Sequence, residues 1–297
     1  MFDITLLTDS RYIKPLKVDN YIQNVLNEDL FVEKALLERG LSVTRIAWDD
    51  KDFTWKDTKF AVFRSTWDYF NRIKEFKNWM MFASTQTNFI NPVQLIQWNL
   101  DKHYLQNLAL RNVKIPETEF LEPGSEISIN NIMQDRGWNE VVLKPAIAAA
   151  GRHTYRVNSS NLSQHEAIFN RLIQDETMLI QEFHSSVLTG GEVALIYFGG
   201  DFSHAVLKKA KAGEFRVQDD FGGSVHRYDP TEEELELGKK AINSCEFLPI
   251  YGRVDLIKNS QGEPMVGELE LIEPELWFRL FPESVNNFAD AIVNYVA

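Results

Sequence analysis

The sequence predicts a mixed α/β (α+β) protein built from more than one subdomain. The chain has 297 residues, which is long for a single hydrophobic core. Over roughly residues 1–95, short apolar strands alternate with helices, a pattern typical of a small parallel α/β unit. Later strands are joined by short Gly-containing turns, which indicates antiparallel hairpins. No long Pro-, Gly- or Ser-rich linker separates these parts, so we expect closely associated subdomains.

The N-terminal unit is predicted from its hydrophobic periodicity. Ile22, Leu26 and Leu30 fall on one face of a helix, and Gly40 can end it. The expected elements are a strand at 4–7, a helix at 22–37, strands at 43–48 and 60–63, a helix at 73–83 and a strand at 88–91.

The rest of the chain predicts further helices and strands. Ser163 and Glu166 have the spacing of a capping box, and Gly199-Gly200-Asp201 is a hairpin turn signal. We expect helices at 101–111, 127–136, 163–174 and 231–246 and from 284, an extended segment at 113–120, and strands at 141–145, 179–183, 193–198 and 202–207.

A hairpin of acidic strands lies near the C-terminus, with its turn at residues 259–262. Glu268 and Glu270 point to the same side of their strand, because side chains alternate. If Gln261-Gly262 centres the turn, Asp255 lies opposite Glu268. Carboxylates beside a core are costly without a cation, and oxygen ligands suit Mg²⁺. The sequence therefore predicts a metal site here, with a solvated strand face as the alternative.

Composition limits the partners. The formal net charge of −12 argues against a nucleic-acid partner, which would need basic patches. No apolar run approaches the roughly 20 residues of a membrane span. Cys245 is the single cysteine, so an intrachain disulfide is impossible, and a reducing compartment is favoured. The first residues lack the pattern of a signal peptide, so we expect a cytoplasmic protein that acts on small molecules.

Two lysines are candidates for binding phosphate. Lys144 ends an apolar strand, where an ammonium group is costly to bury unless it meets an anion. Lys102 opens a predicted helix and could equally be a surface lysine. Small side chains at 146–151, ending in Gly151, would let a flap approach a phosphate closely. A tightly packed turn is the alternative.

Other side chains suit a nucleoside and its terminal phosphate. Glu182 could accept from an adenine amino group, with backbone around Phe183 pairing with the ring, and Glu192 could hold ribose hydroxyls. Each glutamate could also be an ordinary exposed one. Arg216 could clamp a γ-phosphate or the developing charge of an acyl phosphate, or form a structural salt bridge.

In order and spacing, these residues resemble the ATP-grasp superfamily, in its glutathione synthetase-like form. The resemblance covers about residues 98–297 and rests on Lys102, the segments 142–145 and 181–183, Asp255 and Glu268-x-Glu270. Further motifs resemble one bacterial branch, which includes the ligase-like cyclase that closes the cycloserine ring; they are residues 64–69, 91–102, 199–206 and 268–274.

The resemblance implies the ATP-grasp fold. It divides the chain into an N-terminal pre-ATP-grasp α/β domain at 1–98, a lid subdomain at 99–178, and a C-terminal antiparallel-sheet subdomain with the Mg²⁺ site at 179–297. It also implies a carboxylate–amine ligase, or an intramolecular cyclase, that uses ATP and Mg²⁺ (or Mn²⁺). The enzyme would act through an acyl phosphate on an amino-acid or peptide-like substrate, as a possible homodimer.

The resemblance further implies residue roles. Lys102, Lys144, Gly151 and Lys208 would contact the nucleotide together with Glu182, Phe183 and Glu192. Asp255, Glu268 and Glu270 would hold the metal, and Arg216 and Arg253 would stabilise transferred phosphoryl charge. Two departures stand out: the flap is alanine-rich, and Glu270 stands where many relatives carry asparagine.

The loop after the strand at 60–63 is the candidate substrate site, because ligands bind at the carboxyl ends of parallel strands. Arg64 and Ser65 could hold a carboxylate and Asp68 an ammonium group, with Trp67 or Tyr69 as a wall. An Arg–Asp pair that braces a domain interface is the alternative. Arg253 could contact the substrate or balance the glutamates. Rival functions are a non-catalytic ATP-binding regulatory protein and a kinase for a hydroxyl group.

Overall fold

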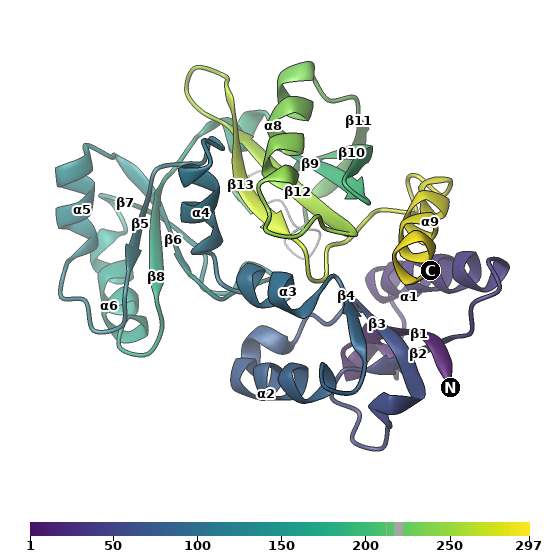
Figure 1. Ribbon diagram of the computed structural model, residues 1–297. Coiled ribbons are helices and arrows are strands. Elements are labelled where there is room, and N and C mark those ends of the chain that lie inside the picture. The colour runs from purple at the N-terminus through teal and green to yellow at the C-terminus, as the bar shows by residue number, and fades with distance from the viewer. Residues whose placement is uncertain (212, 217–221) are drawn as a thin grey trace.

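Three β-sheets and the helices around them make up the protein. The computed structural model describes residues 1–211, 213–216 and 222–297. Within them, two sheets have four strands and one has five. The sheets form three lobes that meet around a central region (Figure 1). None of the helices in these ranges combines the length and the apolar character needed to cross a lipid bilayer.

The N-terminal sheet is parallel, with strand order β2-β1-β3-β4. Its strands β1 and β3 are buried over most of their length because helices cover both faces. The carboxyl ends of β1 and β3 place Thr8 and Ser65 side by side. Its elements are β1 (Phe2–Thr8), α1 (Asn20–Glu38), β2 (Val43–Ala47), β3 (Thr58–Ser65), α2 (Ile73–Ala83) and β4 (Asn88–Ile90), with short 3-10 helices η1 (Ser10–Tyr12), η2 (Trp55–Asp57) and η3 (Tyr69–Asn71).

The central sheet is antiparallel, with order β5-β8-β6-β7, and α5 and α6 supply its core. Gly137 ends α5 in the left-handed conformation (φ 70°) that glycine adopts without strain. Its elements are β5 (Thr118–Leu121), α5 (Ile129–Arg136), β6 (Glu140–Pro145), β7 (Tyr155–Asn158), α6 (Leu162–Leu172) and β8 (Met178–Glu182), preceded by α3 (Val93–Asn99) and α4 (Tyr104–Leu110).

The C-terminal sheet is antiparallel, with order β11-β10-β9-β12-β13. Strand β9 is buried on both faces: Ala194 and Ile196 belong to one hydrophobic cluster, and Leu195 and Tyr197 to another. The elements are α7 (Ser186–Thr189), β9 (Glu192–Phe198), β10 (Asp201–Lys209), β11 (Ser224–Tyr228), α8 (Glu232–Asn243), β12 (Tyr251–Lys258), β13 (Pro264–Glu270) and α9 (Ser284–Val296).

The last helix, α9, ties the C-terminal part to the N-terminal lobe, and Figure 1 shows it beside α1. Phe288 and Ile292 share a core with Val32 and Leu36 of α1. At the surface, Arg39 Nε donates to Asp290 Oδ1 over 2.6 Å. The N-terminal lobe therefore includes residues from the end of the chain.

Most predicted elements are present, and the exceptions have physical reasons. The 199–201 hairpin is confirmed, with Gly199 and Gly200 at positive φ. The capping box at residues 163 and 166 is wrong: Glu166 Oε1 instead accepts from the backbone of Asn130. A capping box does form at Thr231, the N-cap of α8. The boundary expected between residues 178 and 179 falls inside β8, which pairs with β5 and β6 of the central sheet.

Candidate functional site

A cavity of about 280 Å³ lies where the three lobes meet. Each lobe contributes to its walls: Tyr21 and Trp67 from the N-terminal lobe, Lys144 from the central sheet, and Glu268 from the C-terminal sheet. Most of the predicted site residues line it, namely Lys102, Lys144, Gly151, Glu182, Phe183, Glu192, Lys208, Arg216, Arg253, Glu268 and Glu270. The sequence pattern therefore identified side chains that the fold brings together.

The acidic hairpin has the predicted register. In the β12–β13 pair, Asp255 lies opposite Glu268, and Arg253 lies opposite Glu270. A β-bulge follows Asp255 and shifts the register towards the turn. The bulge leaves the acidic end of the hairpin in register, so Asp255 and both glutamates lie close together.

Each of these carboxylates is paired with a cation. Lys102 Nζ is 3.0 Å from Glu268 Oε1 and also donates to the carbonyl oxygen of Ala148, 2.7 Å away. Arg253 contacts both Glu270 and Asp255. Among the described residues, no three His, Cys, Asp or Glu side chains are grouped closely enough to hold a metal ion by themselves.

Asp255 lies beneath the cavity wall and is 2% exposed. Its carboxylate accepts from Arg253 Nε at 2.8 Å and from Lys208 Nζ at 2.8 Å. Burial alone would raise the pKa of Asp255, but these two cations outweigh it and hold the pKa at about 2. Lys208 is shared with Glu192. Asp255 is therefore an anion at neutral pH.

The two glutamates of the hairpin differ in electrostatics. Burial raises the pKa of Glu270 to about 7, despite the charge of Arg253. For Glu268, burial acts in the same direction, but the charges of Lys102 and Lys144 outweigh it and lower the pKa. Burial also lowers the pKa of Lys144 to about 8. The cavity thus keeps Lys144 charged at a cost, which a bound anion would offset.

The opposite wall suits a flat aromatic ring. Arg156 stacks over the Phe183 ring, 4.3 Å from its centroid, and Phe215 meets that ring edge-on at 6.0 Å. The Phe183 backbone N–H donates to the carbonyl oxygen of Glu140, so it is not available to a nucleobase. The next residue, His184, also lines the cavity.

The flap and Arg216 also border the cavity. Ala150 and Gly151 both have positive φ, 51° and 67°, a conformation that costs alanine about 1 kcal/mol. The next residue, Arg152, is held by Glu176 at 2.8 Å. Arg216 forms an ion pair with Glu214, 2.6 Å apart, which agrees with the alternative of a structural salt bridge. Its guanidinium nevertheless lines the cavity.

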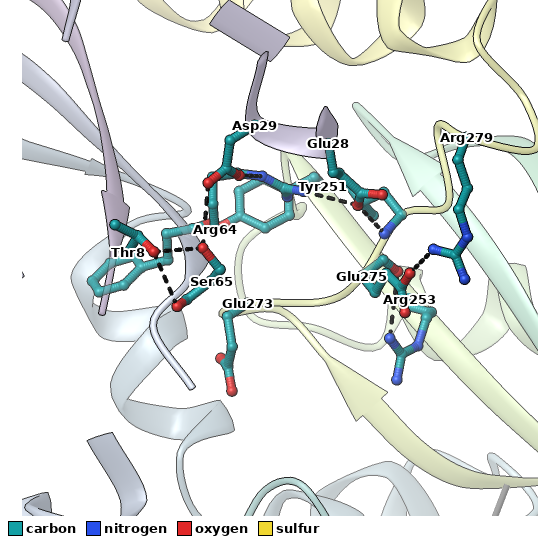
Figure 2. A network of polar contacts seen from close by, with 12 residues as sticks. Thr8, Glu28, Asp29, Arg64, Ser65, Tyr251, Arg253, Glu273, Glu275 and Arg279 are labelled. Carbon is teal, nitrogen blue, oxygen red and sulfur yellow. Dashed lines mark hydrogen bonds and ion pairs between the residues drawn. The ribbon is translucent and has the colours of Figure 1, made fainter. Parts of the chain in front are cut away.

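Polar partners hold the side chains of the candidate substrate loop (Figure 2). Arg64 is 3% exposed and contacts Glu28 at 3.1 Å and Asp29 at 3.7 Å. Ser65 Oγ lies 2.6 Å from the Thr8 hydroxyl. Asp68 accepts from the Trp48 indole at 2.8 Å and pairs with Arg72. The structure favours a bracing role here: Glu28 Oε1 also accepts from the backbone of Leu276, which joins the N-terminal lobe to the C-terminal segment.

The aromatic residues predicted as a wall of the substrate site, Trp67 and Tyr69, line the cavity. Sequence reasoning missed Tyr21 from the same lobe, and it gave no role to Glu273 and Glu275, which also line the cavity. Glu273 lies three residues after Glu270, outside the strand alternation that identified the other acids. Its available signals were its place directly after the acidic hairpin and within the motif at 268–274.

Comparisons with known proteins identify the family. Residues 4–91 match the profile of the N-terminal domain of D-cycloserine synthetase DcsG. Residues 112–246 match the ATP-grasp domain of prokaryotic glutathione synthetase. Residues 112–246 therefore belong to the ATP-grasp superfamily. Both the superfamily and the branch that the sequence motifs resemble are thereby confirmed.

Individual relatives agree with this assignment. The cycloserine biosynthesis protein DcsG of Streptomyces lavendulae is 29% identical over 271 residues, which cover 85% of this chain and 88% of that protein. A crystal structure of D-cycloserine synthetase DcsG superposes with a TM-score of 0.89 at 27% identity, covering 99% of both chains. D-alanine–D-alanine ligase from Bacillus anthracis, complexed with ATP, has a TM-score of 0.70 at 14% identity, covers 100% of this chain and 97% of that one, and shows the shared fold.

These findings confirm the mixed α/β ATP-grasp fold, with its parallel and antiparallel sheets. They support an ATP-dependent carboxylate–amine ligase as the activity class, and they do not favour a non-catalytic regulatory protein. A further relative, the tetrahydromethanopterin:alpha-L-glutamate ligase of Methanosarcina acetivorans, is 24% identical over 59% of this chain and 55% of that protein.

Proposed function

We propose that this protein uses ATP and Mg²⁺ to activate the carboxylate of a small amino-acid-like or peptide-like molecule, which an amine of the same or a second molecule then attacks. The observation that carries the proposal is the cavity, which five basic side chains line together with Glu268 and Glu270 of the acidic hairpin. They are Lys102, Lys144, Lys208, Arg216 and Arg253. Such a set suits a polyphosphate and the charge that develops as phosphate is transferred.

The nucleotide would lie between the central and C-terminal sheets. Lys144 and Lys102 would bind its phosphates, under the flap that ends at Gly151. The base would lie against Phe183, whose ring Arg156 already holds in place. Glu182 would accept from the adenine amino group, and Glu192 would hold the ribose. Lys208 would orient Glu192, to which it is already paired.

The acidic hairpin fits Mg²⁺. The ion is usually held by one or two protein carboxylates together with phosphate oxygens, so three grouped protein ligands are not required. Glu268 and Glu270 line the cavity and offer oxygen ligands, with Asp255 behind them. Bound there, Mg²⁺ would neutralise phosphate charge. The side chains of Lys102 and Arg253, which now pair with these glutamates, would then be free to contact the phosphates. Mn²⁺ has the same preference for oxygen ligands and could replace it.

The proposed reaction has two steps. A substrate carboxylate oxygen attacks the γ-phosphorus of ATP, the bond to ADP breaks, and an acyl phosphate forms. The amine nitrogen then attacks the acyl carbon, phosphate leaves, and the nitrogen loses a proton. Arg253 and Arg216 would stabilise the charge on the transferred phosphoryl group. No protein nucleophile is needed, because positioning and electrostatics supply the rate.

The test is release of ADP from ATP and Mg²⁺ with a panel of amino acids and short peptides. Hydroxylamine in the assay traps an acyl phosphate as a hydroxamate, which a kinase for hydroxyl groups would not produce. We expect Glu268→Gln to abolish both signals. Glu236→Gln, an exposed position on α8, is the matched control and should keep both. Substrate-stimulated ADP release without any hydroxamate would overturn the ligase proposal.

A further inference from the structure

The end of the cavity opposite the nucleotide wall has its own chemistry. Tyr21, Trp67 and Tyr69 line it with their rings, and Glu273 and Glu275 add carboxylates. The proposed function assigns a role to none of these residues. A second, smaller cavity of about 20 Å³ adjoins this end, because Tyr21, Trp67 and Glu275 border both.

Most acids of the main cavity already have a basic partner. Glu268 pairs with Lys102, Glu270 with Arg253, Glu192 with Lys208 and Glu275 with Arg279. Glu182 lies 3.7 Å from His184 Nε2. Across the ranges that the structure describes, Glu273 is the cavity glutamate without an ion pair.

Glu273 is nonetheless buried, with 8% of its surface exposed. The Tyr69 side chain interacts with its carboxylate, and Figure 2 shows the carboxylate pointing away from the Glu28–Arg64–Asp29 group. Burial and the nearby charge of Glu270 raise the pKa of Glu273 to about 8. A buried carboxylate in this position is costly until a cation or a strong donor reaches it.

The aromatic side chains around Glu273 are held in place before any ligand arrives. The Trp67 indole N–H donates to the Glu273 carbonyl oxygen over 3.0 Å. Tyr12 meets the Trp67 ring edge-on at 6.0 Å, and Tyr21 lies 6.3 Å from it. Aromatic faces attract cations, and most strongly where water is excluded. A carboxylate beside such rings is the combination that recognises a protonated amine.

We propose that Glu273, positioned by Tyr69 and flanked by Trp67, binds the protonated amino group of the substrate. The inference rests on the proposed function and narrows its substrate class. Arg253, on the hairpin, borders the same cavity and suits the carboxylate that becomes phosphorylated. A substrate that contacts both carries a carboxylate and an ammonium group, as a small free amino acid does.

The test uses two probes that differ only in the charged amine: alaninamide, which is cationic at pH 7, and propionamide, which is neutral. Neither has a carboxylate, so binding is measured without turnover. The readout is the ¹H–¹⁵N signal of the Trp67 indole, assigned with Trp67→Phe. We expect alaninamide, but not propionamide, to shift this signal, and Glu273→Gln to weaken alaninamide binding at least tenfold.

The controls separate recognition from damage to the fold. Glu275→Gln removes an acid that is already paired with Arg279, so alaninamide should bind within about twofold of the unchanged protein. Tyr69→Phe should weaken binding less than Glu273→Gln does. Calorimetric ATP binding should be the same in all three variants. Equal binding of the two amides, no binding of alaninamide at 50 mM, or unchanged binding in Glu273→Gln would each overturn the inference. If the unchanged protein neither binds ATP nor forms a hydroxamate, that result would instead count against the proposed function.

Discussion

Lys144 gives the sharpest test of the nucleotide site, because its charge should cost stability until an anion binds. Its pKa falls from an ordinary 10.5 to about 8, chiefly through burial. At about 1.4 kcal/mol per unit of pKa, this difference means that the buried charge destabilises the folded protein by roughly 3 kcal/mol at neutral pH. Lys144 is only partly buried and borders the cavity, where water screens its charge. We therefore expect Lys144→Met to raise the free energy of unfolding by about 1 kcal/mol without nucleotide.

The pH dependence has a definite sign. Between pH 8 and 10.5, Lys144 binds more protons in the unfolded chain than in the folded one. Stability of the unchanged protein should therefore rise with pH across this window. The advantage of Lys144→Met should be full below pH 8 and absent above pH 10.5.

The assay is urea unfolding followed by tryptophan fluorescence, with and without ATP and Mg²⁺. A ligand at 100 times its Kd adds about 2.7 kcal/mol to the unchanged protein. Lys144→Met should gain far less, because the ammonium group that meets the phosphates is absent. Lys34, exposed on α1, is the control position. Lys34→Met should change neither the free energy of unfolding without nucleotide nor the gain from ATP. The reasoning fails if Lys144→Met lowers stability without nucleotide while it keeps the full gain from ATP.

Two other predictions concern the frame around the site. Arg64→Met leaves Glu28 buried without its cationic partner, whereas Asp29 keeps Arg45, 2.7 Å away, so the free energy of unfolding should fall by about 3–5 kcal/mol in urea; a loss below about 1 kcal/mol would contradict the bracing role. Burial lowers the pKa of His204 from 6.5 to about 4, so the unfolded chain binds more protons between these values and stability should fall as the pH drops through this window. His204→Gln should flatten that dependence, and an unchanged slope between pH 6.5 and 4 would refute it.

The sequence was most informative where one local pattern determines both structure and chemistry. Alternation along β13 placed Glu268 and Glu270 on one side, and the position of the turn placed Asp255 opposite Glu268, as the structure has it. The hairpin at Gly199-Gly200 was predictable for the same reason, because the turn residues themselves require positive φ. In both cases the determining residues are neighbours in the chain.

Prediction failed where partners come from distant segments. The partners of Arg64 are Glu28 and Asp29, on a helix 36 and 35 positions earlier, and no local pattern connects them. The Phe183 N–H donates to the carbonyl oxygen of Glu140 on a neighbouring strand, a contact that the sequence around Phe183 does not reveal. The short strand β7 was missed because its sequence, Tyr-Arg-Val-Asn, has one fully buried residue. Such contacts depend on the assembled sheets.

The charges of the cavity, taken together, indicate where its ligands lie. Nearly every acid and base on its wall is paired with another, which lets the cleft stay folded without a ligand. Among the described residues, Lys144 and Glu273 lack such an ion pair, and their ionised forms have opposite charge. Lys144 lies with the flap and the hairpin, whereas Glu273 lies with the aromatic wall. A cavity with a lysine and a glutamate that both lack an ion pair is suited to an anionic nucleotide and a cationic substrate group. Charge reversal at either residue should therefore impair one ligand and spare the other.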